Sequence, residues 1–155
     1  MISTNEHAVE SVIQTLSNAV GCYFDALYHG DIEKFSLVMH PRARLFSATG
    51  GSLVELDLPE YLDLVRGRPS PASRQDLRQD EVLSIEVASS TTAHVRVRNS
   101  YPPKNFTDDL TFVHIDGQWR LIAKVWHYEL AERATYEIST HESSGEAPSP
   151  DLLSP

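Results

Sequence analysis

Cysteine is nearly absent from this sequence: Cys22 is the only one in 155 residues. The chain therefore has no internal disulfide, and a reducing compartment is permitted. Basic residues are also scarce, because 13 Lys and Arg stand against 22 Asp and Glu, a formal net charge of −9. That balance disfavours nucleic acids and anionic membranes as partners, since both are bound through clustered basic side chains.

Long apolar runs are missing too, and none approaches the roughly 20 residues that a bilayer-spanning helix needs. The first ten residues, MISTNEHAVE, have neither the basic start nor the apolar middle of a signal peptide. We therefore expect a cytoplasmic protein. The seven histidines form no HExxH or HxH pair, and no Walker-type phosphate loop occurs. We expect neither a metal nor a cofactor.

The length and the hydrophobic content of 41% fit one domain with a single core. We expect this domain to cover residues 1–133. Residues 134–155 are rich in Ser, Pro and Glu and have no hydrophobic period, which predicts a tail outside the core.

Three helices are predicted before the main strands. Apolar residues spaced by three and four predict a long helix over residues 6–28. Gly30 is placed to end it, Asp31 to cap a second helix, and Pro41 to stop that helix. Asp57 is placed to cap a third, which carries Tyr61.

The strands are predicted from alternation and from turn residues. Residues 43–49 and 53–56 read as a short hairpin, and residues 83–87 and 93–97 alternate as two strands. A long hairpin over residues 105–130 turns at Asp116-Gly117. Helices followed by strands predict an α+β domain, in which a strongly curved mixed or antiparallel sheet wraps around the first helix. The open end of such a cone is a natural pocket.

The sequence resembles the nuclear transport factor 2 superfamily, with its cystatin-like α+β cone, and within it the small bacterial proteins called lumazine-binding or polyketide-cyclase-like. The resemblance rests on YFDALYHGD (23–31), HPRARL (40–45), RPSPASR (68–74), FTDDLTFV (106–113) and DGQWRLIAKVWHYEL (116–130). The superfamily includes isomerases, dehydratases, cyclases and transport adaptors, so the resemblance implies the fold more strongly than any one activity.

Comparison with the steroid isomerases of this superfamily implies two oxyanion-binding residues. Tyr23 stands at the position of their helix tyrosine, and Asp109 at that of their strand aspartic acid, with Asp108 one step away. A tyrosine and a protonated aspartic acid can both donate hydrogen bonds to a developing oxyanion. Alternation leaves open which aspartate points inward. The general base of those enzymes falls near Ser47, which has no carboxylate.

His127 is the candidate for acid or base catalysis, because its ordinary pKa lies near 6.5. We place it on the pocket-facing side of its strand with Ala123 and Val125. The alternative is a core histidine held by a backbone carbonyl. Tyr23 has a competing role in core packing.

Candidates for ligand binding come from the loop, the sheet and the third helix. These candidates are Tyr61, Arg98, Arg74, Trp126 and His40. Each has a structural alternative: packing for the two aromatic residues, surface exposure for the two arginines, and a favourable charge at a helix end for the histidine.

Together these patterns predict a small-molecule pocket enzyme of the lyase or isomerase type, such as an isomerase, dehydratase or cyclase, acting on a carbonyl compound. His127 would carry the acid/base work, with Asp109 or Asp108 and Tyr23 assisting. Two alternatives stay open: a non-catalytic binder of a pterin-like or aromatic ligand, and a dimeric adaptor. We also expect a homodimer formed through the sheet.

Overall fold

The fold is known from a computed structural model, which describes residues 4–131. The tail predicted for residues 134–155 lies outside the described residues. In chain order the elements are α1 (Thr4–His29), α2 (Ile32–Val38), β1 (Met39–Ser47), β2 (Val54–Asp57), α3 (Leu58–Arg66), β3 (Asp80–Val87), β4 (Thr92–Tyr101), β5 (Lys104–Ile115) and β6 (Gln118–Leu130). No helix within these described residues is long and apolar enough to cross a bilayer.

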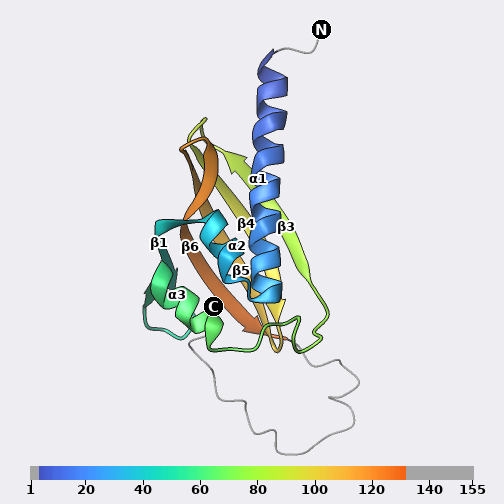
Figure 1. The fold of residues 1–155 in the computed structure, drawn as a ribbon, viewed down its shortest axis with the longest axis vertical. Helices are drawn as coiled ribbons and strands as arrows, with labels where there is room; N and C mark the ends of the chain where they lie inside the picture. The colour runs from blue at the N-terminus through green and yellow to red at the C-terminus, as the bar shows by residue number, and fades with distance from the viewer. Residues whose placement is uncertain (1–3, 132–155) are drawn as a thin grey trace, which may run out of the picture.

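The strands form one curved sheet in the order β2-β1-β6-β5-β4-β3. Neighbouring strands are antiparallel except β1 and β6, which run parallel. The long helix α1 lies along the hollow side of the sheet, with α2 beside it and α3 on the far side of α2, and its first turns extend past the strands (Figure 1). The predicted α+β cone with a mixed sheet is confirmed.

Local signals in the sequence fix most of the element ends. Gly30 adopts a φ of 61°, and the Asp31 carboxylate accepts a hydrogen bond from the Lys34 amide at 3.1 Å at the start of α2. The Asp57 carboxylate accepts from the Glu60 amide at 2.9 Å, while the Glu60 carboxylate accepts from the Asp57 amide at 3.1 Å. This reciprocal cap satisfies two otherwise unpaired amides of α3 and brings the following Tyr61 to the core.

The predicted end of the second helix is wrong. Helix α2 ends at Val38, and Met39 is already extended, so Pro41 lies inside β1 instead of stopping the helix. The pairing of β1 with β6 shifts register between Met39 and Arg44. A proline is tolerated at such an irregularity because no ladder hydrogen bond is required from it.

A β-bulge interrupts the long hairpin that β5 and β6 form. Thr111 lies opposite Ala123, but Phe112 lies opposite Leu121, so Ile122 is one residue too many on β6. An extra residue reverses which side chains face inward beyond it, since side chains alternate along a strand.

The burial pattern of β6 shows this reversal. Trp119 and Leu121 face inward before the bulge, and Lys124 and Trp126 face inward after it. His127 is therefore turned outward, with 54% of its side chain exposed. A continuous alternation from Leu121 would have placed His127 inside.

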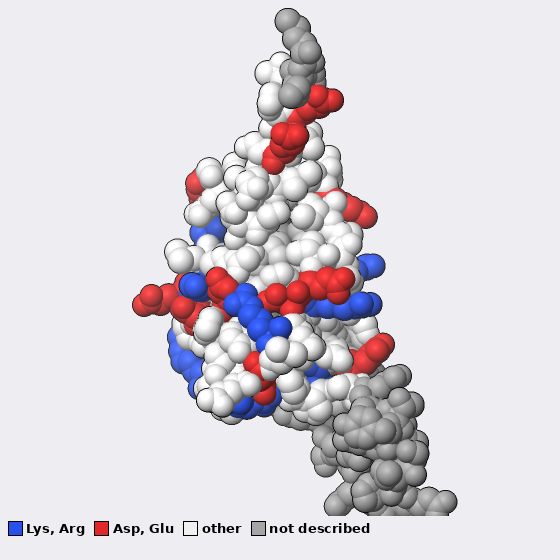
Figure 2. Space-filling model, turned by 90° about the vertical axis from the view of Figure 1, so that its right-hand side faces the viewer, with Lys and Arg blue, Asp and Glu red and all other residues white. Residues whose placement is uncertain are grey.

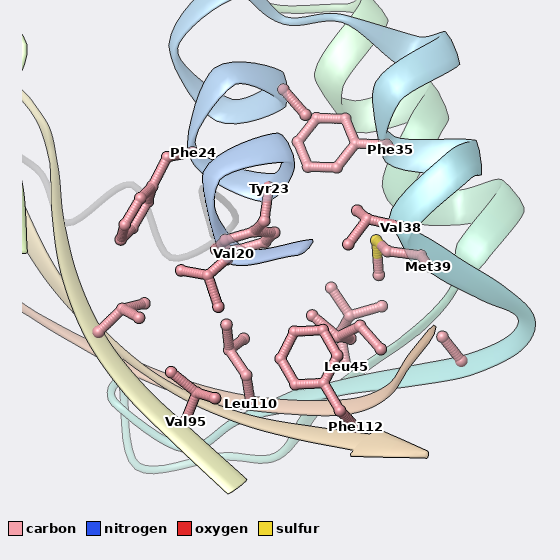
Figure 3. Packing of buried hydrophobic residues seen from close by; sticks show 14 of the residues in the cluster. Val20, Tyr23, Phe24, Phe35, Val38, Met39, Leu45, Val95, Leu110 and Phe112 are labelled. Atoms are coloured by element: carbon pink, nitrogen blue, oxygen red, sulfur yellow. The ribbon is translucent and has the colours of Figure 1, made fainter. Parts of the chain in front are cut away.

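The hydrophobic core fills the space between the helices and the hollow face of the sheet. Side chains from α1, α2, β1, β4 and β5 point toward one another there (Figure 3). The labelled members are Val20, Tyr23, Phe24, Phe35, Val38, Met39, Leu45, Val95, Leu110 and Phe112. Because the core is continuous from the helices to the sheet, any polar group pointing inward is removed from water.

Ion pairs tie the loop of residues 67–79 to α1. The Asp25 carboxylate accepts a hydrogen bond from Arg78 at 2.7 Å and lies 3.5 Å from Lys34. Arg78 also donates to Asp80 at 2.8 Å. Figure 2 shows acidic and basic side chains lying next to one another in a band across one face of the molecule, without a large patch of one sign.

Candidate functional site

A buried carboxylate lies at the centre of the polar groups inside the cone. Asp108 is on the inward face of β5 and is 0% exposed. Its Oδ2 atom accepts a hydrogen bond from the Tyr23 hydroxyl at 2.6 Å and from the Asn99 side-chain amide at 2.7 Å. Tyr23 comes from α1 and Asn99 from β4, so three elements meet at one oxygen atom.

A buried amine faces the same oxygen. Lys124 on β6 is 1% exposed, and its Nζ atom lies 3.7 Å from Asp108 Oδ2. Three aromatic rings surround this Nζ, with their centroids at 5.4 Å for Tyr23, 5.2 Å for Tyr61 and 5.5 Å for Trp126. Charged side chains are almost never fully buried unless they are paired, and even a buried pair costs free energy because both groups lose their contact with water. We call these six residues, Tyr23, Tyr61, Asn99, Asp108, Lys124 and Trp126, the interior polar cluster.

Two oxygen atoms of this cluster lack a hydrogen-bond partner among residues 4–131. They are Asp108 Oδ1 and the Tyr61 hydroxyl oxygen, and both are buried. A buried polar atom without a partner costs about 1–3 kcal/mol, so the cluster has capacity for a hydrogen-bonding ligand.

The Tyr23 phenol is held in its protonated form. Burial, first, and then the charge and hydrogen bond of Asp108 raise the pKa of Tyr23 well above its ordinary value. At neutral pH Tyr23 is therefore a hydrogen-bond donor and not a base.

A small surface crevice touches one member of the interior polar cluster, Asn99. It lies between the end of α1, the loop of residues 67–79 and the end of β4, and is lined by Phe24, Tyr28, Arg68, Tyr101 and Asn99 among others. Asn99 belongs to both the crevice and the cluster, because its amide donates to Asp108. Asp108 does not itself line the crevice, and Asn99 is the link between the two.

Four of the residues predicted from the sequence lie together in this interior. Tyr23, Tyr61, Asp108 and Trp126 are all buried, at 3% exposure or less. The question of which aspartate points inward is answered in favour of Asp108. Asp109 faces outward, where its carboxylate accepts a hydrogen bond from Arg96 at 2.6 Å and lies 3.5 Å from His94. The placement of Asp109 beside Tyr23 is therefore wrong, because side chains alternate along β5.

His127 and Arg98 lie on the outer face of the sheet. His127 is 3.6 Å from Glu129, and with Arg98, Glu81 and Thr107 it lines a broad open hollow there. Placing His127 on the pocket-facing side was wrong because of the bulge at Ile122. The homodimer expected through this sheet stays a prediction.

Arg74 and His40 are also apart from the interior. Arg74 stacks on the Tyr101 ring at 4.5 Å and donates to Asp76 at 2.7 Å and to the Pro102 carbonyl at 2.9 Å. These contacts hold the loop beside the crevice. His40 lies in β1, not at a helix end, and its Nδ1 accepts a hydrogen bond from the Arg42 amide at 3.0 Å.

Sequence reasoning missed Lys124 and Asn99. Both carry a signal: Lys124 is two residues from Trp126, and Asn99 continues the inward row of Ala93, Val95 and Val97 on β4. Among the described residues no three His, Cys, Asp or Glu side chains gather as a metal-ligand group.

The long helix held in a curved mixed sheet, with polar groups pointing inward, defines a cone protein of the nuclear transport factor 2-like class. A protein of this class from Silicibacter pomeroyi DSS-3 superposes with a TM-score of 0.68 at 21% identity, over 83% of this chain and 100% of that one. A ketosteroid isomerase-like protein from Erwinia carotovora atroseptica SCRI1043 gives 0.59 at 12% identity, over 74% and 94%. At these identities the likeness establishes the fold alone.

Residues 11–127 match the family described as "Putative lumazine-binding", and the protein belongs to that family. A relative named aldolase FrzH, from a Cladobotryum species, is 23% identical over 124 residues. The matched residues cover 79% of this chain and 95% of the relative.

Proposed function

We propose that the protein is a cofactor-independent enzyme of the lyase or isomerase type, which moves a proton at the carbon next to a carbonyl group. The observation that carries the proposal is the setting of Asp108. One of its oxygens is held by Tyr23 and Asn99, while the other is buried without a partner among the described residues. A carboxylate held on one side and open on the other is oriented to accept a proton from a bound substrate.

The groups around Asp108 supply the other requirement of this chemistry, which is to stabilise negative charge on the carbonyl oxygen. When the proton leaves the carbon, charge develops on that oxygen as an enolate. The Lys124 amine, when protonated, and the Tyr61 hydroxyl can both donate to it, and the interior excludes the water that would screen them. Apolar rings from Tyr23, Tyr61 and Trp126 would contact the body of the substrate.

The comparisons support this class of reaction without naming the substrate. Loss and gain of a proton next to a carbonyl is the shared step of aldol and keto–enol chemistry, and the relatives include a protein named an aldolase and one named ketosteroid isomerase-like. This assignment moves the acid/base role from His127 to Asp108.

The test is exchange of hydrogen for deuterium next to the carbonyl of a panel of ketones, followed by NMR in heavy water. The panel contains steroid ketones and aromatic polyketide-like ketones. We expect the protein to accelerate exchange of at least one member, and Asp108→Asn to lower the rate by about 10²–10⁴-fold. Asp109→Asn is the matched control, because it makes the same chemical change in the next residue, whose side chain lies on the outer face of the sheet. Equal rates for wild type and Asp108→Asn would refute the proposal.

A second candidate, binding without chemistry, follows from the description of the family. A lumazine is a flat heterocycle with hydrogen-bonding edges, and the aromatic walls and unpartnered oxygens of the interior suit such a molecule. A thermal-shift screen with pterins and flavins tests it, since a ligand at a hundred times its Kd adds about 2.7 kcal/mol of stability. Stabilisation without exchange of any ketone would favour the binder.

A further inference from the structure

Lys124 has the surroundings of a nucleophilic amine more than those of a structural ion pair. Its Nζ lies 3.7 Å from Asp108 Oδ2, longer than the roughly 2.7–2.9 Å of a charge-assisted hydrogen bond. Asp108 Oδ2 already accepts hydrogen bonds from Tyr23 and Asn99. The hydrogen bonds of this oxygen are therefore supplied without the amine, and what Lys124 adds to Asp108 is its buried counter-charge.

The aromatic enclosure of Lys124 also favours reactivity. Three rings lie around the Nζ atom and the side chain is 1% exposed, so water is excluded from the amine. A lysine attacks carbonyl carbons as the neutral amine, and the exclusion of water protects the resulting imine from hydrolysis.

We infer that Lys124 forms a covalent imine with an aldehyde or ketone substrate during the reaction. The inference rests on the proposed function, because it assigns the proton transfer next to the carbonyl to Asp108. The neutral Nζ attacks the carbonyl carbon, a C–N bond forms, and the carbonyl oxygen becomes a hydroxyl by taking a proton. Loss of this hydroxyl with a second proton releases one water and leaves the C=N bond of the imine.

The imine makes the next proton transfer easier. Protonated at nitrogen, it withdraws electrons from the neighbouring carbon, whose proton passes to the open Oδ1 of Asp108. The electron pair of that C–H bond forms the enamine, which can bond to a second carbonyl carbon or be protonated again at carbon. Addition of water then breaks the C–N bond and restores the Lys124 amine.

The entry of a small carbonyl compound to Lys124 would begin at the crevice beside Asn99. Asn99 lines this crevice and donates to the same carboxylate oxygen that faces the amine. Entry requires the Asn99 side chain to move aside, while Asp108 keeps its bond to Tyr23. The substrate class is therefore a compact aldehyde or ketone with a hydrogen on the neighbouring carbon and an apolar or flat body.

The lysine content of the chain makes the inference directly testable. The sequence has three lysines, Lys34, Lys104 and Lys124. Lys34 is the internal reference. Its side chain is 41% exposed, so a carbonyl compound reaches it from solvent without a binding pocket. Lys124 is buried and reacts only if the interior admits the probe.

The experiment treats the full chain with acetylacetone, which forms a stable enaminone with a neutral lysine, and in parallel with benzaldehyde and borohydride, which reduces an imine to a permanent amine. Near-ultraviolet absorbance and mass spectrometry of peptides locate the adducts. We expect label at Lys124 in excess over Lys34, and its loss in Lys124→Arg with the Lys34 signal unchanged. Label at Lys34 with none at Lys124 would overturn the inference.

The deuterium-exchange assay separates this inference from the proposed function. Lys124→Arg keeps a positive charge but does not form an imine. If Lys124→Arg accelerates deuterium exchange as fast as wild type, for a ketone on which wild type is active, Lys124 acts through its charge. The imine is then refuted, while Asp108 remains the base. If Lys124→Arg falls to the rate of Asp108→Asn, the imine is supported. If wild type exchanges no ketone although Lys124 is labelled, the proposed function fails and the reactive amine stands.

Discussion

The hydroxyl of Tyr23 and the carboxylate of Asp108 lie 2.6 Å apart, although 85 positions separate the two residues in the sequence. The bond joins the long helix to the middle of the sheet inside a core from which water is removed. It keeps the phenol protonated and holds one carboxylate oxygen in place. Stability and chemistry therefore depend on the same short contact.

Replacing Asp108 by Asn should destabilise the protein strongly. The change leaves the Lys124 amine buried with no counter-charge beside it, and breaking a buried pair in this way costs about 3–5 kcal/mol. Urea unfolding at neutral pH measures the loss. Asp109→Asn should cost about 1 kcal/mol or less, because the Asp109 ion pair is at the surface.

The same experiment has a second arm that isolates the buried charge. Adding Lys124→Met to Asp108→Asn should recover most of the lost stability, since the uncompensated amine is then gone. A double variant as unstable as Asp108→Asn alone would show that the loss comes from the hydrogen bonds of Asp108 instead.

Tyr23 should remain un-ionised in the folded protein when the solution is made alkaline. Its pKa is raised by folding, so its contribution to stability is complete below the ordinary value of 10.0 and declines as the pH rises beyond it. Titration followed by tyrosinate absorbance should give the same amplitude for wild type and Tyr23→Phe while both are folded. A wild-type amplitude larger by one tyrosine would contradict the buried hydrogen bond.

Asp25 should stabilise the protein at neutral pH and not in acid. Its pKa is lowered from 3.8, first by the hydrogen bond from Arg78, so the stabilisation is present above that value and lost as the pH falls through the lowered pKa. Asp25→Asn should lower the unfolding midpoint at neutral pH, and the difference from wild type should shrink as the pH falls below 3.8 and through the lowered pKa.

A matched surface carboxylate provides the control for Asp25. Asp63 pairs with Arg66 at 2.8 Å within one helix, and 78% of its side chain is exposed. Asp63→Asn should change the midpoint little at any pH. Equal effects of the two substitutions would mean that tying the loop to α1 adds nothing beyond an ordinary surface pair.

The fold was predictable because its signals are local. Gly30 and Asp31 mark a helix boundary, Asp57 and Glu60 cap a helix, and Asp116-Gly117 turns the long hairpin with φ angles of 52° and 78°. Each depends on residues within a few positions of one another. Helices followed by alternating strands then leave few ways to cover the apolar faces.

The site was only half predictable, because it depends on which way each strand faces. Alternation pairs Asp108 with Leu110 and Phe112, all of which are buried, but the sequence alone did not identify that row as the inward one. On β6 the difficulty is greater, because the bulge at Ile122 is seen only in the pairing with β5. It places Lys124 in the interior, whereas regular alternation from Leu121 would have placed His127 there.

That bulge has a consequence for how the interior can vary among related chains. Ile122 is the residue for which β5 has no partner, so its deletion would remove the bulge while Leu121, Lys124 and Trp126 stayed on the inward face of β6. The extra residue therefore decides how the sequence of β6 maps onto its two faces. Among chains of this shape, a gap of one residue at this point of the last strand should mark loss of the bulge, with the residues aligned to Lys124 and Trp126 still pointing into the cone.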